Sequence, residues 1–179
     1  MWVVWSVALA AYIVGVMHRT SFGVAGLDAA QRFHAGPAAL SGFVVLQLLV
    51  YAALQVPVGL LLDRFGGRVL VAVGALTMAA GQFVLALATT LPLAVTARVL
   101  IGTGDALTFI SVLSVVTAWF PPRQVPVMTQ LTGLVGQLGQ VLSAVPLAAL
   151  LHGPGWTTAF LCAAGLGVFV GRDKTQRIL

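Results

Sequence analysis

The stretch GLLLDRFGGR, residues 59–68, separates two long apolar runs, residues 40–62 and 69–88. Each run has the roughly 20 mostly apolar residues that a helix needs to cross a lipid bilayer. Between them, the Gly66-Gly67 pair permits a tight turn, because glycine takes backbone conformations that other residues avoid. The stretch therefore predicts a charged turn that joins two membrane-spanning helices.

The overall composition extends this prediction to the whole chain. Of its 179 residues, 60% are hydrophobic, and only nine are basic and four acidic. This balance leaves too little polar surface to cover a water-soluble globule, so one domain inside the bilayer, residues 1–179, is expected. The formal charge of +5 does not indicate nucleic-acid binding, because the basic side chains stand singly rather than in a patch.

Six apolar runs are candidate spans, and together they predict an all-α membrane protein with six transmembrane helices. Short segments that are polar or rich in proline and glycine lie between the runs and predict turns. The predicted spans are residues 2–27, 40–62, 69–88, 93–119, 127–151 and 156–170, and the predicted turns are residues 28–37, 63–68, 89–92, 121–122 and 153–155.

The basic residues predict how these helices are oriented. Cytoplasmic loops of membrane proteins carry an excess of lysine and arginine. With the N-terminus inside, the opposite side of the membrane holds only Arg32. We therefore expect both termini in the cytoplasm and the chain in the plasma or inner membrane. The basic residues on the predicted cytoplasmic side are Arg64, Arg68, Arg123, Arg172, Lys174 and Arg177.

A weak internal echo predicts two inverted three-helix repeats. The sequence LSG at residues 40–42 is echoed by LTG at residues 131–133, and Pro57 is echoed by Pro146. Three spans separate the copies, so the two copies run in opposite directions through the membrane, as in many transporters. Chance similarity between apolar sequences explains the same echo. The repeats would cover about residues 1–88 and 93–171.

The turn at residues 59–68 resembles the loop signature of the major facilitator superfamily, in which a glycine precedes an acidic–basic pair, a further glycine and basic residues. The matching residues are Gly59, Asp63, Arg64, Gly66 and Arg68. The resemblance implies a loop that latches the two halves of a transporter together, with Gly59 allowing close helix approach and Asp63 pairing with arginines. The sequence departs at Gly67, where a basic residue is usual. A basic turn that only sets topology is the alternative.

The fourth run contains RVLIGTGDA, residues 98–106, with two charged residues seven positions apart. Arg98 and Asp105 therefore share one helix face and are expected to face the same cavity. A charge exposed to lipid near mid-span costs at least about 2.5–3.5 kcal/mol, so Asp105 should face water or a partner. Arg98 has an alternative, because it could extend to the outer interface.

The first run contains HRTSFGVA, residues 18–25, which resembles the first-helix signature of the organic anion symporters within the superfamily. In that subgroup an acidic residue precedes the arginine, whereas His18 precedes Arg19 here, and Gln124 also stands where an acid is common. A guanidinium in a cavity can hold a carboxylate or phosphate through two hydrogen bonds, which favours an anionic substrate. An arginine at the outer membrane surface is the alternative for Arg19.

Glutamines give two further runs a polar face. Gln47 and Gln55 lie in the second run, and Gln137 and Gln140 lie in the fifth run among glycines. Because the resemblance implies that these helices line the central pathway, all four are candidate substrate ligands. Hydrogen bonding between helices explains the same pattern without a substrate.

Enzymatic, metal and cofactor chemistry find no support in the sequence. No histidine or cysteine pair has metal-ligand spacing, and no phosphate-binding glycine loop or nucleophile elbow occurs. Val145 rather than glycine precedes Pro146, so the glycine–proline signature of proton-driven exporters is missing.

The resemblance matches only the first half of a twelve-helix transporter. We therefore expect the N-terminal half of a secondary transporter for a small organic anion, coupled to a proton or another ion. A second six-helix half, or a second copy of the chain, would complete the pathway. The alternatives are a non-transporting six-helix interaction or assembly subunit, and half of a drug/proton efflux transporter.

Overall fold

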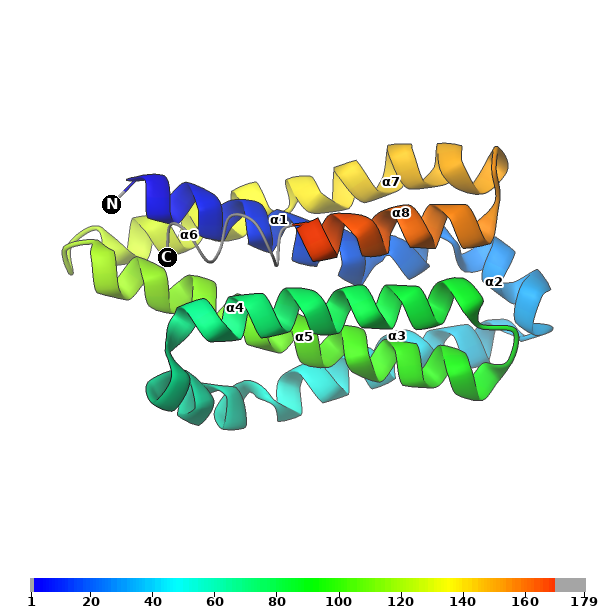
Figure 1. Ribbon diagram of the computed structural model, residues 1–179, viewed down its shortest axis with the longest axis horizontal. Coiled ribbons are helices and arrows are strands. Elements are labelled where there is room, and N and C mark those ends of the chain that lie inside the picture. Colours follow the sequence, from blue (N-terminus) through cyan, green and yellow to red (C-terminus); the bar gives the residue numbers. More distant parts are fainter. Residues whose placement is uncertain (1, 170–179) are drawn as a thin grey trace.

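The computed structural model describes residues 2–169, and over these residues the chain is all helical, with short connections (Figure 1). The apolar, helix-favouring runs form the helices, and proline- or glycine-containing segments end them. The helices are α1 (Trp2–Val24), α2 (Gly26–Phe33), α3 (Pro37–Ala53), α4 (Gln55–Leu87), α5 (Leu91–Trp119), α6 (Val125–Gly136), α7 (Leu138–His152) and α8 (Trp156–Phe169).

Four of the helical stretches are long and apolar enough to cross a membrane. A fifth span is formed if α2 and α3, which are bent by 115° relative to each other, are taken together, and α8 is a shorter apolar helix. The prediction of an α-helical membrane protein with several spans is therefore confirmed, whereas the count of six is not. The four stretches are Val4–Val24, Val69–Leu87, Leu91–Trp119 and Val125–His152.

The structure departs from the predicted boundaries at several places, among them Gln137, which separates α6 from α7 within the fifth predicted span, and two of the departures have a local reason. The second predicted span is interrupted at Leu54, between α3 and α4. Pro57 explains the break, because its ring clashes with the carbonyl of Ala53 and it has no N–H to donate to that carbonyl. The predicted turn at residues 28–37 instead contains α2, with Asp28 in its first turn and Arg32 in its last. These charges complement the helix dipole.

The predicted turn between the second and third spans is confirmed at Gly66. Helix α4 consists of two helical segments, and Gly66 between them has φ 78° and ψ 159°. This backbone conformation strains residues that have a Cβ atom, so glycine is needed here.

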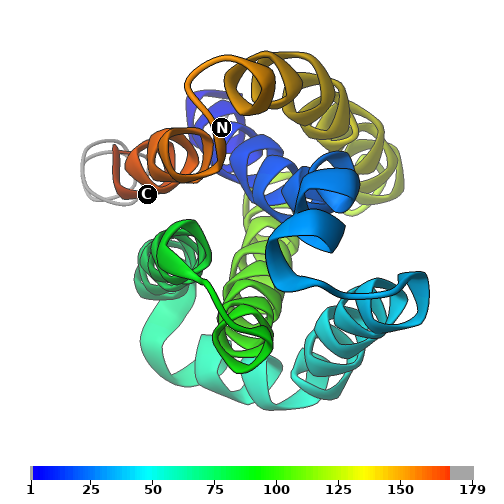
Figure 2. The same ribbon diagram turned by 90° about the vertical axis from the view of Figure 1, so that its right-hand side faces the viewer.

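Helix α5 is the central element and contacts α1, α3 and α4. Its contact with α4 is close because of paired glycines: a Cβ atom on Gly104 would lie 2.5 Å from the carbonyl oxygen of Gly74. Glycines at such crossings let two helix backbones approach each other. The view along the bundle in Figure 2 shows α5 among these neighbours, so side chains on α5 can meet partners from several helices.

The two ends of the bundle hold different connections. The bend of α4 and the connection from α5 to α6 lie at the end where α1 begins (Figure 1). The other end holds α2 and the connections from α4 to α5 and from α7 to α8. The basic residues of the first end include Arg64 and Arg123. The predicted end of the sixth span at residue 170, and Arg172, Lys174 and Arg177, lie outside the described residues.

Candidate functional site

Helices α1 and α5 are joined by an ion pair inside the bundle. Arg19 Nη1 donates to Asp105 Oδ2 over 3.4 Å. Asp105 is 1% exposed and Arg19 is 22% exposed, so the arginine retains access to the surrounding space. The other carboxylate oxygen of Asp105 is buried without a hydrogen-bond partner. Among the side chains that the structure describes, which do not include that of Arg68, this is the only salt bridge.

Arg98 is also buried, and the two side chains that contact its guanidinium are uncharged. Its Nη1 donates to Gln47 Oε1 on α3 over 2.7 Å, and its guanidinium lies 4.2 Å from the centre of the Phe22 ring on α1. The side chain is only 1% exposed, so it points into the bundle rather than toward the membrane surface. The cation–π contact and the single hydrogen bond compensate part of the lost hydration.

These two arginines line one cavity between α1, α3 and α5. The cavity is open on one side and measures about 620 Å³ when this open space is included, and no acidic side chain is among its lining residues. Arg98 Nε and Nη2 and Gln47 Nε2 are buried there without hydrogen-bond partners. The site therefore presents unpaired donors, which suits a ligand rich in acceptor oxygens. The lining residues are Arg19, Thr20, Phe22, Gly23, Val44, Gln47, Leu48 and Arg98.

The structure brings only part of the predicted site together. Arg19, Gln47 and Arg98 line the cavity, and Asp105 is tied to it through Arg19. Gln55 begins α4 and is not among the lining residues.

Gln137 and Gln140 are exposed and hydrogen-bond to each other over 2.5 Å, and neither is among the lining residues of the cavity. Gly136 and Gly139 instead pack their backbones against Tyr12 and Ile13 of α1. The polar pattern of the fifth span therefore accompanies close helix packing.

One aromatic residue, Phe22, lines the site but was not predicted as part of it. Phe22 lies three residues after Arg19 and so shares its helix face. Outside the lining, Tyr12 on α1 and Tyr51 on α3 each pack against Phe109 on α5, with ring centres 5.5 Å and 6.1 Å apart. The sequence signal that could have identified Phe22 is its spacing of three residues from Arg19.

The residues of the predicted latch loop lie at the bend of α4. No atom lies within 4 Å of a Cβ built on Gly59, so this glycine is not at a close helix crossing within the described structure. Gly67 has that role instead, because its Cβ would lie 3.3 Å from Ser114 Oγ on α5. Asp63 and Arg64 are exposed, and Arg64 lies over the Phe65 ring at 5.4 Å. The side chain of Arg68 lies outside the described part of the structure.

Comparison with known proteins gives two results. A family model described as Major Facilitator Superfamily matches residues 7–171. An uncharacterized transporter of Bacillus subtilis (strain 168), YybO, is 27% identical over 167 residues. That match covers 93% of this chain but 38% of YybO, so the chain spans well under half the length of this relative.

Proposed function

The chain belongs to the major facilitator superfamily, and from this membership we propose that it contributes the N-terminal half of a secondary transporter for a small organic anion. Membership makes the chain a membrane transport protein that moves a solute, not an enzyme. The nature of the solute, symport, and the plasma or inner membrane as its location are parts of the proposal.

The observation that carries the anion assignment is the cavity that Arg19 and Arg98 share without an acidic lining residue. The Arg98 guanidinium and the Gln47 amide offer more hydrogen-bond donors than the described side chains satisfy, and Arg19 adds a second positive charge. A carboxylate or phosphate supplies the missing acceptors and compensates buried positive charge. A cationic or purely apolar solute would leave these donors unpaired.

The Arg19–Asp105 pair suggests how transport is coupled to an ion. An incoming carboxylate competes with Asp105 for the same guanidinium, because Arg19 is the partially exposed member of the pair. When Asp105 loses that partner, it remains as a buried anion that needs another positive charge. A proton or another small cation at Asp105 meets this need, which makes symport with the anion the proposed mode.

The cavity also needs a second wall. Val44 and Leu48, which line it, are 44% and 51% exposed, and the chain spans 38% of YybO. A second six-helix half, or a second copy of this chain, would close the pathway over Arg19. Rocking of the two bodies, with the loop at Asp63 and Arg64 as latch, would then alternate access.

Anion binding can be tested separately from transport. The purified chain in detergent is screened with small carboxylates and phosphates by thermal shift, and the best ligand is used for affinity measurement. Arg19→Ala and Arg98→Ala should each weaken binding by at least about tenfold, because each removes charge-assisted hydrogen bonds. Arg123→Ala, at the exposed connection between α5 and α6, is the matched control and should bind normally.

Uptake into proteoliposomes then tests the transporter assignment, with and without a coexpressed C-terminal half from a full-length relative. Uptake that is lost in Arg19→Ala and kept in Arg123→Ala supports the proposal. Equal anion binding by Arg19→Ala, Arg98→Ala and the unmodified chain would contradict the proposal that the two arginines bind an anionic solute.

A further inference from the structure

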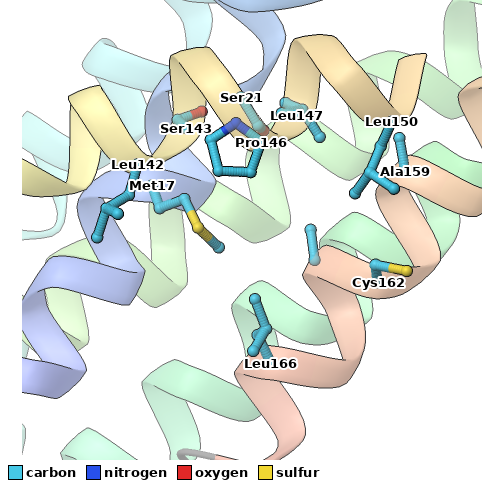
Figure 3. A pocket seen from close by; sticks show the side chains of 11 residues that line it. Met17, Ser21, Leu142, Ser143, Pro146, Leu147, Leu150, Ala159, Cys162 and Leu166 are labelled. Atoms are coloured by element: carbon cyan, nitrogen blue, oxygen red, sulfur yellow. The ribbon is translucent and has the colours of Figure 1, made fainter. Parts of the chain in front are cut away.

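We propose that a second cavity, between α1, α7 and α8, binds a neutral linear amphiphile: an aliphatic chain with one terminal hydroxyl that enters from the bilayer. This cavity is open at its rim, measures about 350 Å³ when the open space is included, and shares no lining residue with the arginine cavity. Its lining residues are Met17, Ser21, Leu142, Ser143, Pro146, Leu147, Leu150, Ala159, Cys162, Ala163 and Leu166 (Figure 3).

The lining favours a hydrocarbon chain over an ion. It contains no charged side chain, and apart from two serines and one thiol its side chains are hydrocarbon or thioether. A charged headgroup in such surroundings would lose its hydration without gaining a partner. An uncharged aliphatic chain loses nothing of this kind and gains van der Waals contacts with the walls.

One wall carries a hydroxyl group that lacks a partner. Ser143 on α7 is fully buried, and its Oγ has no hydrogen-bond partner. Buried polar groups are nearly always hydrogen-bonded, so this one indicates a missing partner. The other serine is already engaged: Ser21 Oγ donates to the His18 carbonyl over 2.7 Å and accepts from Gln82 Nε2 over 2.9 Å. Ser143 is thus the available polar position.

Pro146 leaves a backbone carbonyl of the same helix without a hydrogen-bond donor. It lies within α7 and has no N–H, so the carbonyl of Leu142, four residues earlier, lacks its usual helical donor. Figure 3 shows Ser143 and Pro146 on α7, with Cys162 and Leu166 across the cavity on α8. A ligand hydroxyl can accept a hydrogen bond from Ser143 and donate one to the Leu142 carbonyl. A hydrocarbon without a hydroxyl would leave both groups unpaired.

The rim of the cavity gives access from lipid. Leu142 and Leu166 are 50% and 48% exposed on helices that are apolar along their length, and Cys162 is exposed. Such a rim faces acyl chains when α7 crosses the bilayer. The occupant therefore partitions into the membrane before it enters the cavity.

Cys162 allows a direct test, because it is the only cysteine of the chain. The chain is placed in lipid nanodiscs, and the rate of maleimide labelling is measured against the concentration of 1-decanol. We expect saturable protection, with labelling slowed at least threefold. Decyltrimethylammonium, which carries a charge in place of the hydroxyl, should not protect.

Ser143→Ala tests the hydrogen bond. The concentration of 1-decanol that gives half-protection should rise about threefold to tenfold, as expected for one lost hydrogen bond. The variant should remain folded, because it removes a buried group that has no partner, and thermal unfolding checks this. Ser114→Ala is the matched control, since Ser114 lies on α5 outside the cavity and donates to the Ser111 carbonyl.

Two outcomes would overturn the proposal. Equal protection by n-decane, which has no hydroxyl, would mean that any hydrocarbon fills the cavity. If a folded Ser143→Ala variant needs the same concentration of 1-decanol for half-protection, Ser143 does not bind the ligand hydroxyl. Neither outcome affects the anion assignment, which depends on the other cavity.

Discussion

Arg98 combines deep burial with few compensating contacts. Arginine is seldom fully buried unless it is paired, and here a glutamine and a phenylalanine ring take the place of a carboxylate. Unlike Asp105, which has Arg19, Arg98 has no acidic partner among the described residues. The position of Arg98 therefore depends on Gln47, because the side-chain oxygen Oε1 of Gln47 accepts the one hydrogen bond that Arg98 donates. An anion in the cavity would supply the rest.

Gln47→Leu should consequently destabilise the fold. Leucine has a similar volume but no acceptor, so Arg98 Nη1 becomes a further buried unpaired donor at a cost of about 1–3 kcal/mol. Each kcal/mol lowers the thermal midpoint by about 2–4 °C in a chain of this size. Thermal unfolding in detergent measures the change, with Gln130→Leu on the exposed face of α6 as control. Equal midpoints for both variants would show that Gln47 does not hold Arg98.

At the level of helices, glycine spacing decides which elements touch. Gly74, Gly81, Gly102 and Gly104 all lie where an added Cβ would be 2.5–2.8 Å from a neighbouring helix. Gly102 lies against α3, and the atom nearest to its added Cβ is the backbone carbonyl oxygen of Gln47. The same helix that carries Arg98 and Asp105 is thus drawn close to α3 and α4, which places Gln47 within hydrogen-bond distance of Arg98.

Gly104→Ala should separate α4 from α5. Its Cβ would meet the backbone carbonyl of Gly74 at 2.5 Å, and backbone cannot rotate away as a side chain can. Overpacking of this kind costs about 1–3 kcal/mol. The control is Gly165→Ala in α8, where no atom lies within 4 Å, and alanine there should be neutral or stabilising by up to about 1 kcal/mol. Thermal midpoints in detergent compare the two, and equal losses would contradict a close α4–α5 crossing.

For the whole molecule, the distribution of charge between the two ends of the bundle predicts its orientation. The bend of α4 and the connection from α5 to α6 lie at one end, with Arg64 and Arg123, whereas α2 carries Arg32 at the other (Figure 1). The excess of basic residues marks the cytoplasmic side.

Topology reporters test this orientation. Tags inserted after Asp63 and after Arg123 should both report the cytoplasm, and a tag within residues 153–155 should report the outside. Protease protection of intact cells provides a second reading. If the tags after Asp63 and after Arg123 both report the outside, the proposed orientation is wrong and the proposed latch loop is not cytoplasmic.

The sequence by itself determined the helical membrane class and the turn at Gly66, because the length of apolar runs and the conformational freedom of glycine act locally. The sequence also held the signal for the break at Leu54, because Pro57 follows it three residues later, although a continuous span was predicted there. Only the tertiary structure decided which polar residues meet. Gln47 and Arg98 are 51 residues apart and form a hydrogen bond, whereas Gln137 and Gln140 had an equally polar pattern but are exposed and do not line the arginine cavity. The rotation and crossing of whole helices set such contacts, and these depend on packing between distant segments that no local pattern records.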